Sequence, residues 1–357
     1  MALGLFLIAL LVMAEFVARL WLVYVRHLPA GWTDVIGVSY FPELRAPMVA
    51  GIGPGDGHYD VLILAGSVMY DYYGAPATHL KEALERRGLT GVRVWNLARP
   101  AQTTRDSLIK YRWLAGKRFD WVIVYHGINE LRADNVPEAE FRSDYSHLAW
   151  YAEVNAVAPG PPGGFSSLLA LPPFWREALA RARLYRNPPS VRYDEAPSPE
   201  AAAHGASIKT AAGFGANLES IAALARERGD PLSLATFASW LDPEYSDQVM
   251  EADIAASKQG RPAERRLHYA HPFYADFAQP CRIWGRPENL VKGLAAHNEQ
   301  TRRVARQTGA TLVDAAAAIP GTSADPGSLF IDICHLAPDG VEALTAALAA
   351  AAPAAAR

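Results

Sequence analysis

Two short stretches of the sequence carry side chains suited to act together as a nucleophile and its base. Ser67 follows an apolar run, Val61–Leu64, that has the length and composition of a buried parallel strand. Far along the chain, Asp332 precedes His335 by three residues, just before a helix that is expected to begin near Pro338. A carboxylate at that spacing can fix the tautomer of the imidazole and stabilise its charged form. An ordinary Gly-Ser turn and a helix-capping segment are the plainer interpretations of the two stretches taken singly.

Two further loops offer hydrogen-bond donors for a developing oxyanion. Asn129 lies in the stretch His126–Glu130 after a predicted strand, and its side-chain amide is a donor of the right kind. The stretch Asn96–Thr104 follows another predicted strand and leads into a helix, so its backbone N–H groups would favour negative charge. Arg99 and Glu130 flank the resulting pocket and are candidates for contact with a substrate.

Apolar runs alternate with helical stretches along most of the chain, which predicts an α/β sheet with mostly parallel strands and right-handed crossovers. Because parallel strands end at a common edge, the polar residues that follow them should converge there. The expected strands are 61–64, 92–96, 121–125, 231–237 and 311–314, and the expected helices are 79–87, 104–114, 214–228, 290–308 and 340–352. The Pro- and Gly-rich stretch 159–205 and the stretch 242–286 are interpreted as irregular insertions.

Composition excludes several classes of function. The 357 residues hold 34 basic and 37 acidic side chains without a basic patch, so no nucleic-acid partner is expected. No Gly-x-Gly-x-x-Gly or phosphate-binding loop is present, which argues against a nucleotide-binding domain. Cys281 and Cys334 are too few for a disulfide framework or a cysteine-based zinc site, although one disulfide and two unpaired thiols both stay open. His268, His271 and His297 lack metal-ligand spacing, so neither a metal nor a cofactor is expected.

The N-terminus is of a different kind. Residues 2–25 form an apolar stretch long enough to span a bilayer as a helix, in which Glu15 and Arg19 stand at i,i+4 and can pair. No basic segment precedes the stretch and no small-x-small cleavage site follows it, which favours an uncleaved single-pass anchor over a signal peptide or a buried helix. Arg19 and Arg26, counted alone, would place the following domain in the cytoplasm. We expect an anchor at 1–27, a linker at 28–59 and one domain at 60–353 with insertions near 150–210 and 242–287.

The order of the chemical motifs resembles that of the SGNH hydrolases, also called the GDSL esterase/lipase family. Ala65-Gly66-Ser67, the loop after the second strand, Gly127-Ile128-Asn129 and Asp332-Ile333-Cys334-His335 stand in the order of the four blocks of that family. The resemblance covers roughly 61–145 and 216–350. It implies a three-layer α/β/α sandwich of flavodoxin-like type, with a mostly parallel sheet and one transmembrane helix ahead of it.

The resemblance also implies a role for each matched residue. These are the nucleophile Ser67, the base His335, its orienting acid Asp332, oxyanion donors at the Ser67 and Ala101 backbone and the Asn129 amide, and substrate contacts at Arg99, Gly127 and Glu130. Two departures stand out: the acidic residue before the serine is absent, and the glycine of the second block is Ala101, or Ala98 in another register. A backbone N–H survives the change to alanine if the backbone angles admit a Cβ.

By resemblance, the chain is expected to be a serine esterase acting on O-acyl or O-acetyl esters of a cell-envelope glycan or lipid, with acyl transfer as the related reaction. The resemblance also favours an extracytoplasmic domain over the placement that the arginine count suggests. Tyr70, Tyr72, Tyr73 and Trp150 would then line a platform for a sugar, or else fill the core. The alternative is a catalytically weak SGNH-like domain that binds a glycan or scaffolds an envelope complex, which the two altered blocks suggest.

Overall fold

The computed structural model describes residues 2–28, 30, 36–161, 168–186, 197–241, 283–319 and 325–354. The elements run in the order α1 (Ala2–Tyr24), α2 (Gly37–Tyr40), η2 (Pro42–Leu44), α3 (Arg45–Val49), β1 (Tyr59–Ala65), η3 (Ser67–Met69), α4 (Pro76–Arg86), β2 (Val92–Asn96), α5 (Thr104–Trp113), β3 (Trp121–Tyr125), η4 (Asn129–Asp134), α6 (Ala149–Val157), α7 (Leu171–Arg186), α8 (Pro199–His204), α9 (Thr210–Arg228), β4 (Leu232–Ala235), α12 (Pro287–Thr308), β5 (Thr311–Val313), α13 (Ala315–Ala318), η8 (Pro326–Leu329) and α14 (Pro338–Ala350). The chain divides into two compact units. Unit 1 comprises Met1–Ala50, Ile109–Gly116 and Asp144–Ser190, and unit 2 comprises Gly51–Leu108, Lys117–Ser143 and Val191–Arg357.

Unit 2 is built on a sheet of five parallel strands in the order β2-β1-β3-β4-β5. This is the flavodoxin-like order, in which the chain steps from β1 to one neighbour and then crosses back to the other side. The register pairs Val61 of β1 with Val94 on one side and Trp121 on the other. Every residue of β1 and β3 is buried, as expected for parallel strands that helices cover on both faces.

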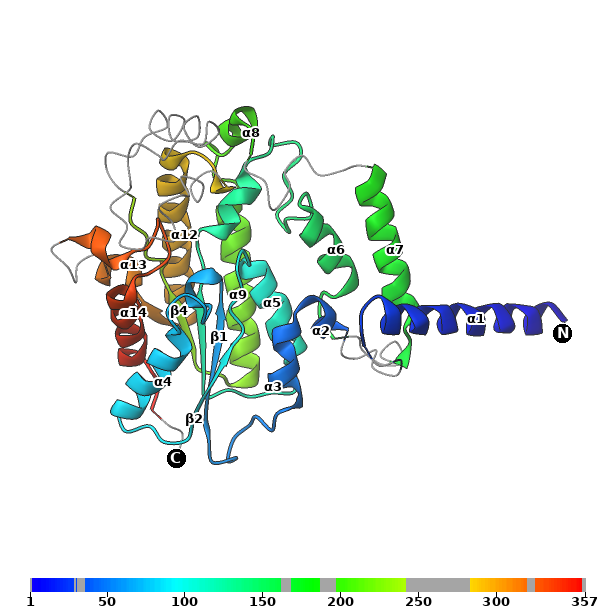
Figure 1. The fold of residues 1–357 in the computed structure, drawn as a ribbon, viewed down its shortest axis with the longest axis horizontal. Coiled ribbons are helices and arrows are strands. Elements are labelled where there is room, and N and C mark those ends of the chain that lie inside the picture. Colours follow the sequence, from blue (N-terminus) through cyan, green and yellow to red (C-terminus); the bar gives the residue numbers. More distant parts are fainter. Residues whose placement is uncertain are drawn as a thin grey trace. The chain divides into compact units, whose positions relative to one another are not determined.

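Helices cover both faces of this sheet (Figure 1). α4 and α14 pack against each other on one face, while α12 packs against α9 and along β4 and β5 on the other. Right-handed crossovers require this division, because the step from β1 to β2 runs along the sheet in the opposite direction from the later steps. The predicted three-layer α/β/α architecture with a parallel sheet is therefore confirmed.

Element bounds agree closely with the sequence-based expectations in the sheet and less well outside it. β2 and β3 have the predicted bounds, whereas α4 begins at Pro76 and α9 at Thr210, each a few residues early. The stretch 159–205, predicted to be irregular, contains α7 and α8. α7 opens with Leu171-Pro172-Pro173, where proline is compatible with the first turn, and continues with residues of high helix propensity. Most of the second predicted insertion lies outside the described residues.

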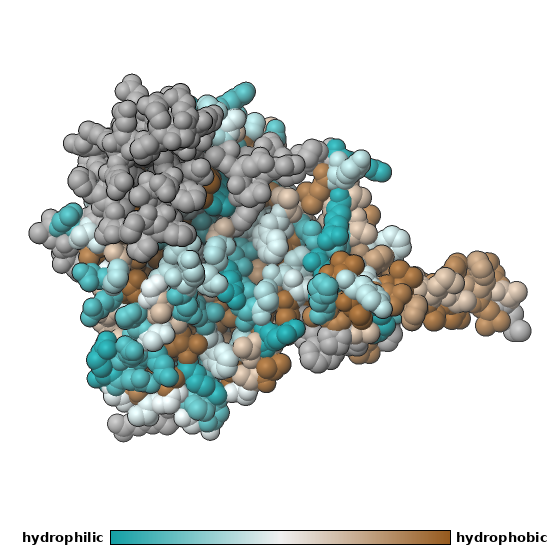
Figure 2. Space-filling view, viewed as in Figure 1, coloured by the Kyte–Doolittle hydropathy of each residue, from teal (hydrophilic) through white to brown (hydrophobic). Residues whose placement is uncertain are grey.

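Unit 1 contains one helix that is long and apolar enough to cross a membrane, the only such helix within the described ranges. This is α1, which Figure 2 shows as an apolar projection. Glu15 and Arg19 pair at 2.9 Å, as their spacing predicted. The predicted linker 28–59 includes α2, η2 and α3, and its Phe41 and Leu44 are fully buried. Trp150 packs edge-on against Phe41 with ring centroids 5.8 Å apart, so it serves the core of unit 1.

Candidate active site

Ser67 stands at the carboxyl edge of the sheet, where β1 gives way to η3. Only Gly66 separates it from the strand, and a side chain at that position would crowd its neighbours. A Cβ on Gly66 would lie 2.9 Å from Asn129 Nδ2 and 3.2 Å from the carbonyl oxygen of Gln102. The loops that follow β1, β2 and β3 therefore meet at this point. An acidic residue before the serine, as in the SGNH pattern, would require Asn129 or the Gln102 loop to move.

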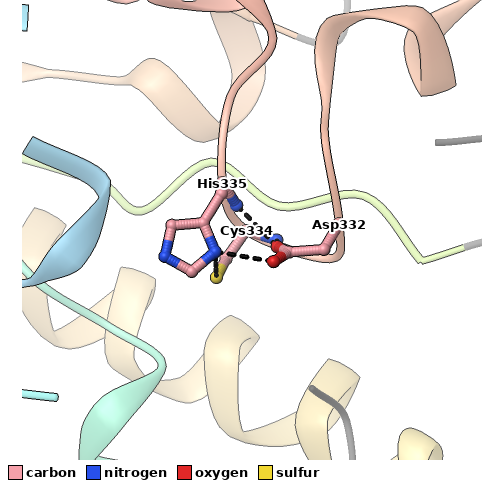
Figure 3. Close-up of side chains that lie close together, drawn as sticks. All are labelled: Asp332, Cys334 and His335. Atoms are coloured by element: carbon pink, nitrogen blue, oxygen red, sulfur yellow. Dashed lines mark hydrogen bonds and ion pairs between the residues drawn. The ribbon is translucent and has the colours of Figure 1, made fainter. Parts of the chain in front are cut away.

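Asp332 and His335 lie on a tight loop ahead of α14, closed by a bridge between Phe330 and Leu336 (Figure 3). Asp332 Oδ1 accepts the backbone N–H groups of Cys334 and His335, both at 2.8 Å, and Oδ2 lies 2.6 Å from His335 Nδ1. Burial acts to raise the pKa of the Asp332 carboxyl, but the charge and hydrogen bonds of His335 and the two backbone bonds outweigh it. The net direction of the pKa is downward, so the carboxylate is ionised at neutral pH.

The other nitrogen of the imidazole faces the serine. His335 Nε2 lies 2.8 Å from Ser67 Oγ. Because Nδ1 faces a carboxylate, it carries the ring proton, and Nε2 then offers a lone pair to the serine hydroxyl. The side chains of Ser67, His335 and Asp332 thus form a continuous hydrogen-bonded chain, and all three residues are buried. The ring of Tyr73 lies beside the imidazole, with centroids 4.4 Å apart and planes at 32°, which restricts rotation of His335.

The thiol of Cys334 lies 3.5 Å from His335 Nδ1, on the side of the ring away from Nε2 (Figure 3). Asp332, Cys334 and His335 bring three atoms of metal-ligating type within 4.8 Å of one another. Two nitrogen or oxygen ligands of one tetrahedral zinc ion would stand about 3.3 Å apart. The observed 2.6 Å between Oδ2 and Nδ1 is instead the length of a charge-assisted hydrogen bond. The cluster therefore has the geometry of a base and its orienting acid. Cys281 lies outside the described residues.

Asn129, the first residue of η4, is held at both ends of its amide. Oδ1 accepts from Trp284 Nε1 at 3.1 Å, and Nδ2 donates to the carbonyl oxygen of Gln102 at 2.9 Å. These bonds decide which end of the amide faces Gly66, and it is the nitrogen. An amide nitrogen has two N–H groups, so the bond to Gln102 leaves the second N–H for another acceptor.

Ala101 has a φ of 65°, in the left-handed region that favours glycine. This conformation costs a residue with a Cβ roughly 1–2 kcal/mol, whereas glycine adopts it freely. The chain thus keeps a glycine-like backbone where the SGNH pattern has glycine. The alternative register is less suitable, because the N–H of Ala98 already donates to Asn96 Oδ1 at 3.0 Å.

Two of the predicted substrate contacts, Gly127 and Glu130, lie in the interior. A Cβ on Gly127 would lie 2.5 Å from the Cβ of Phe237, so Gly127 is packed beneath that ring. Glu130 is 0% exposed, and its Oε1 accepts the N–H of Thr104 at 2.6 Å, at the start of α5. Burial raises the pKa of Glu130 to about 7. The positions of Gly127 and Glu130 close to Asn129 in the sequence gave no sign that both residues face the interior.

Arg99 and the tyrosines that follow Ser67 lie on the solvent side of the site, where Tyr72 is exposed and the others are half-buried. The Arg99 guanidinium lies 5.1 Å from the centroid of the Tyr70 ring. Tyr72 is 71% exposed and meets Tyr73 edge-on at 5.3 Å, and Tyr73 in turn lies against the imidazole. An aromatic surface therefore leads from solvent to the hydrogen-bonded chain.

A buried polar chain behind the Asn129 loop escaped the sequence analysis. His297 of α12 places Nδ1 2.7 Å from the carbonyl oxygen of Gly127 and Nε2 2.9 Å from Thr210 Oγ1, which lies 2.8 Å from Asp134 Oδ2. Burial lowers the pKa of His297 to about 4 and raises that of Asp134 to about 7. The four partners come from separate segments, so no local spacing marks them. His297 therefore has a structural role in the interior, while His268 and His271 lie outside the described residues.

No family model matches the chain, and no curated protein sequence matches it. The chain is similar in structure to a lipase/acylhydrolase from Enterococcus faecalis, with 15% identity, coverage of 82% of this chain and 93% of that one, and a TM-score of 0.39. It is also similar to Axe2, an acetylxylan esterase from Geobacillus stearothermophilus, with 16% identity, coverage of 84% and 94%, and a TM-score of 0.41. A third similar structure is LAE5, an alpha/beta hydrolase enzyme from the metagenome of Lake Arreo. It has 15% identity and a TM-score of 0.42, and the match covers 85% of this chain and 97% of that one.

Proposed function

We propose that the chain is a serine ester hydrolase of the SGNH type, with Ser67 as nucleophile, His335 as base and Asp332 as the acid that orients it. The observation that carries the proposal is the hydrogen-bonded chain from Asp332 through His335 to Ser67, with 2.6 Å and 2.8 Å between successive atoms. The bound carboxylate keeps the lone pair on Nε2, and this is the tautomer that a general base requires.

The reaction follows from these positions. Ser67 Oγ attacks the carbonyl carbon of the ester while its proton passes to His335 Nε2. The bond to the leaving alcohol breaks as Nε2 returns that proton to the alcohol oxygen. Water, deprotonated by the same nitrogen, then attacks the acyl-enzyme and releases the acid. Asp332 stays ionised throughout and stabilises the imidazolium.

Three donors would hold the negative oxygen of the tetrahedral intermediate: the N–H of Ser67, the N–H of Ala101 and the amide of Asn129. One such donor is worth about 2.7–4 kcal/mol of the barrier. The bonds from Trp284 and to Gln102 hold the Asn129 amide in place before substrate arrives. Little reorganisation is then needed when the oxyanion forms.

We assign O-acyl or O-acetyl esters of a cell-envelope glycan or lipid as the substrate class. The exposed ring of Tyr72 and the half-buried ring of Tyr73 suit the apolar face of a sugar, and Arg99, which lies over the ring of Tyr70, adds hydrogen-bond donors. In this proposal α1 is a single-pass anchor and unit 2 works on the extracytoplasmic side. A sugar hydroxyl in place of water would turn the same acyl-enzyme into an acyl donor.

A fluorophosphonate probe tests the nucleophile. The full-length wild type should be labelled and Ser67→Ala should not, while Ser220→Ala, a matched change on α9, should be labelled like the wild type. No labelling of any of the three would sink the enzyme assignment and favour the glycan-binding alternative. A panel of acetylated sugars and p-nitrophenyl esters then separates a carbohydrate esterase, which prefers acetyl, from a lipase, which prefers long chains.

A further inference from the structure

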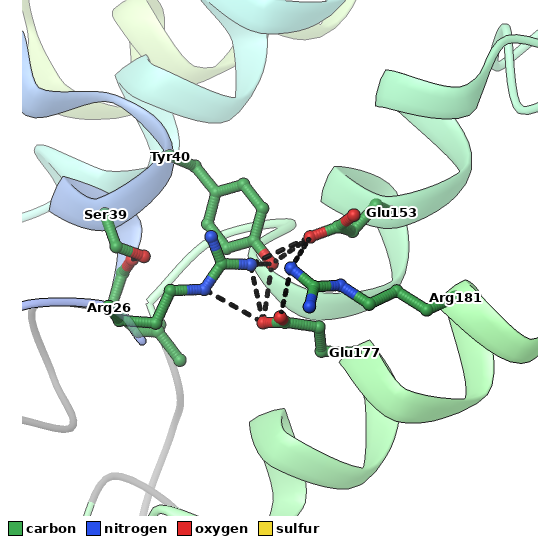
Figure 4. Close-up of polar contacts among 7 residues, drawn as sticks. Arg26, Ser39, Tyr40, Glu153, Glu177 and Arg181 are labelled. Atoms are coloured by element: carbon green, nitrogen blue, oxygen red, sulfur yellow. Dashed lines mark hydrogen bonds and ion pairs between the residues drawn. The ribbon is translucent and has the colours of Figure 1, made fainter. Parts of the chain in front are cut away.

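A cluster of charged side chains ties α7 to the end of α1 (Figure 4). Arg26 donates through Nε to Glu177 Oε2 at 2.9 Å and pairs with Glu153 at 2.8 Å, and Tyr40 bonds to both acids. Arg181 lies 2.8 Å from the other oxygen of Glu177. Arg26 thus compensates the charges of the two glutamates, as charges withdrawn from water require, and the exposed Arg181 adds a second positive charge beside Glu177. The face of α7 that carries Glu177 is therefore committed to the interior of unit 1.

The opposite face of α7 is apolar and exposed. Trp175 and Leu179 are 54% and 55% exposed, and Ala182 continues the same stripe at spacings of four and three residues. Arg176 and Arg183 lie along one edge of this stripe, Arg186 ends it, and all three are exposed, whereas the single acidic residue of α7 lies on the buried face. An apolar stripe bordered by arginines is typical of a helix that lies in the plane of a membrane surface.

α7 meets α1 well before the end of α1. The carboxylate of Glu15 accepts the N–H groups of Ala170 and Leu171 at 2.9 Å each, at the start of α7. Trp21 packs edge-on against Phe174, with centroids 5.7 Å apart. Figure 1 shows α7 running across the direction of α1, with α6 on one side of α7 and the N-terminal half of α1 extending away on the other. The stripe opposite α6 therefore points the same way as the N-terminal half of α1.

The length of α1 brings a bilayer to the level of α7. Residues 2–13 are exposed on all sides, and from Ala14 onward one face of the helix is covered. The uncovered part spans about 18 Å at roughly 1.5 Å per residue, against a hydrocarbon core of about 30 Å. Phe16, Val17 and Leu20 remain exposed and continue the apolar surface of α1 past the start of α7. A bilayer that surrounds α1 must therefore reach α7.

We propose that α7 is a second membrane-binding element. It lies in the interfacial layer of a bilayer that contains anionic lipid, with Trp175 and Leu179 among the acyl chains and Arg176 and Arg183 at the phosphates. The proposal rests on the membrane anchor of the proposed function and is independent of the chemistry at Ser67. Two contacts, α1 and α7, then set how unit 1 is tilted and rotated on the bilayer, which a single helix leaves undetermined.

Depth-dependent fluorescence tests this with the full-length protein in nanodiscs of phosphatidylcholine, with or without phosphatidylglycerol. A polarity-sensitive fluorophore is attached at Leu179→Cys in a Cys281→Ser background, where Cys334 is buried. Lipid-borne quenchers should quench this probe and shift its emission to the blue. A probe at Leu11→Cys in α1 should be quenched as well. A probe at Val49→Cys, an exposed apolar position of α3 in the same unit, should not be quenched.

Charge reversal tests the arginines. Arg176→Glu combined with Arg183→Glu should reduce quenching at 179 in anionic nanodiscs and leave the probe at Leu11→Cys unaffected. Equal quenching of the probe at 179 with the native arginines and with the two glutamates would overturn the role of the arginines.

Three outcomes at the probes would overturn the proposal. An unquenched probe at 179 beside a quenched probe at 11 would mean that α7 stands off the bilayer. A probe at 179 that is shielded from water but not quenched, with crosslinks between copies, would mean that a second copy of the chain covers the stripe. An unquenched probe at 11 would remove the anchor itself, and the fluorophosphonate result would remain unaffected.

Discussion

Replacing Asp134 by asparagine should stabilise the protein, by an amount that grows as the pH rises. The reason lies in the count of protons along the buried chain. His297 Nδ1 lies 2.7 Å from the carbonyl oxygen of Gly127, which can only accept, so Nδ1 carries the ring proton. Nε2 of a neutral imidazole then accepts the one proton of the Thr210 hydroxyl at 2.9 Å. Thr210 Oγ1 lies 2.8 Å from Asp134 Oδ2, and a protonated carboxyl at that place can donate to the hydroxyl while the hydroxyl donates to Nε2.

Asparagine reproduces this arrangement without a titratable proton. Its amide nitrogen can donate to Thr210, and its oxygen can accept the N–H groups of Lys209 and Thr210, which Asp134 Oδ1 accepts at 2.8 Å and 2.9 Å. Burial raises the pKa of Asp134 from its ordinary 3.8 to about 7. A raised carboxyl pKa contributes stability that is complete below about pH 4 and is lost as the pH rises to about 7. A pKa difference of about three units, at roughly 1.4 kcal/mol per unit, lowers the free energy of unfolding by about 4 kcal/mol at high pH. Asp134→Asn avoids this loss because the amide does not titrate.

Urea unfolding of wild type and Asp134→Asn measures the effect. The variant should gain about 1.5 kcal/mol in free energy of unfolding at pH 5 and about 4 kcal/mol at pH 8. Asp144→Asn is the control, because Asp144 is exposed and its carboxylate accepts the N–H of the nearby Ser146 at 3.0 Å. The control should change stability by at most about 0.5 kcal/mol at either pH. A gain that is equal at both pH values, or a loss at pH 8, would mean that Asp134 and His297 are both charged and would refute the proton count.

Three further substitutions test the site. Asp332→Asn should lower kcat for p-nitrophenyl acetate about 10⁴-fold with little change in KM, since it removes the acceptor that fixes the tautomer; a change of less than tenfold would contradict the role of the carboxylate. Asn129→Ala should lower kcat about 10²–10³-fold through the lost oxyanion donor, and an unchanged kcat would exclude that role. Ala101→Gly should leave stability unchanged or raise it by up to about 1 kcal/mol, because relief of the left-handed strain offsets the entropy of glycine. Ala346→Gly on the exposed face of α14 should cost about 1 kcal/mol, and equal losses at the two positions in urea unfolding would contradict the strain at Ala101.

The sheet was predictable because burial on both faces is visible in local composition. β3 appears in the sequence as a short apolar run and is buried throughout, whereas the edge strand β2 appears as alternating valines, Val92 and Val94, and is mostly half-buried. The structure gives both strands the predicted bounds. α7 was not predictable in the same way. Its opening Leu171-Pro172-Pro173 has the composition of a loop, and the carboxylate that accepts the N–H groups at its start comes from Glu15, 155 residues earlier. A helix whose end is stabilised from so far away leaves little local signal.

For the candidate site, the sequence alone determined which residue types are available for the chemistry and in what order they occur. Serine, asparagine and the Asp-x-x-His spacing could be selected because that chemistry needs those groups at strand ends. Only the tertiary structure decided that Glu130 turns inward, that Tyr73 lies against the imidazole and that burial raises the pKa of Asp134. Side-chain direction and protonation depend on which distant groups pack together and how much water they exclude. A residue type is a local property, whereas desolvation and hydrogen bonding belong to the assembled environment.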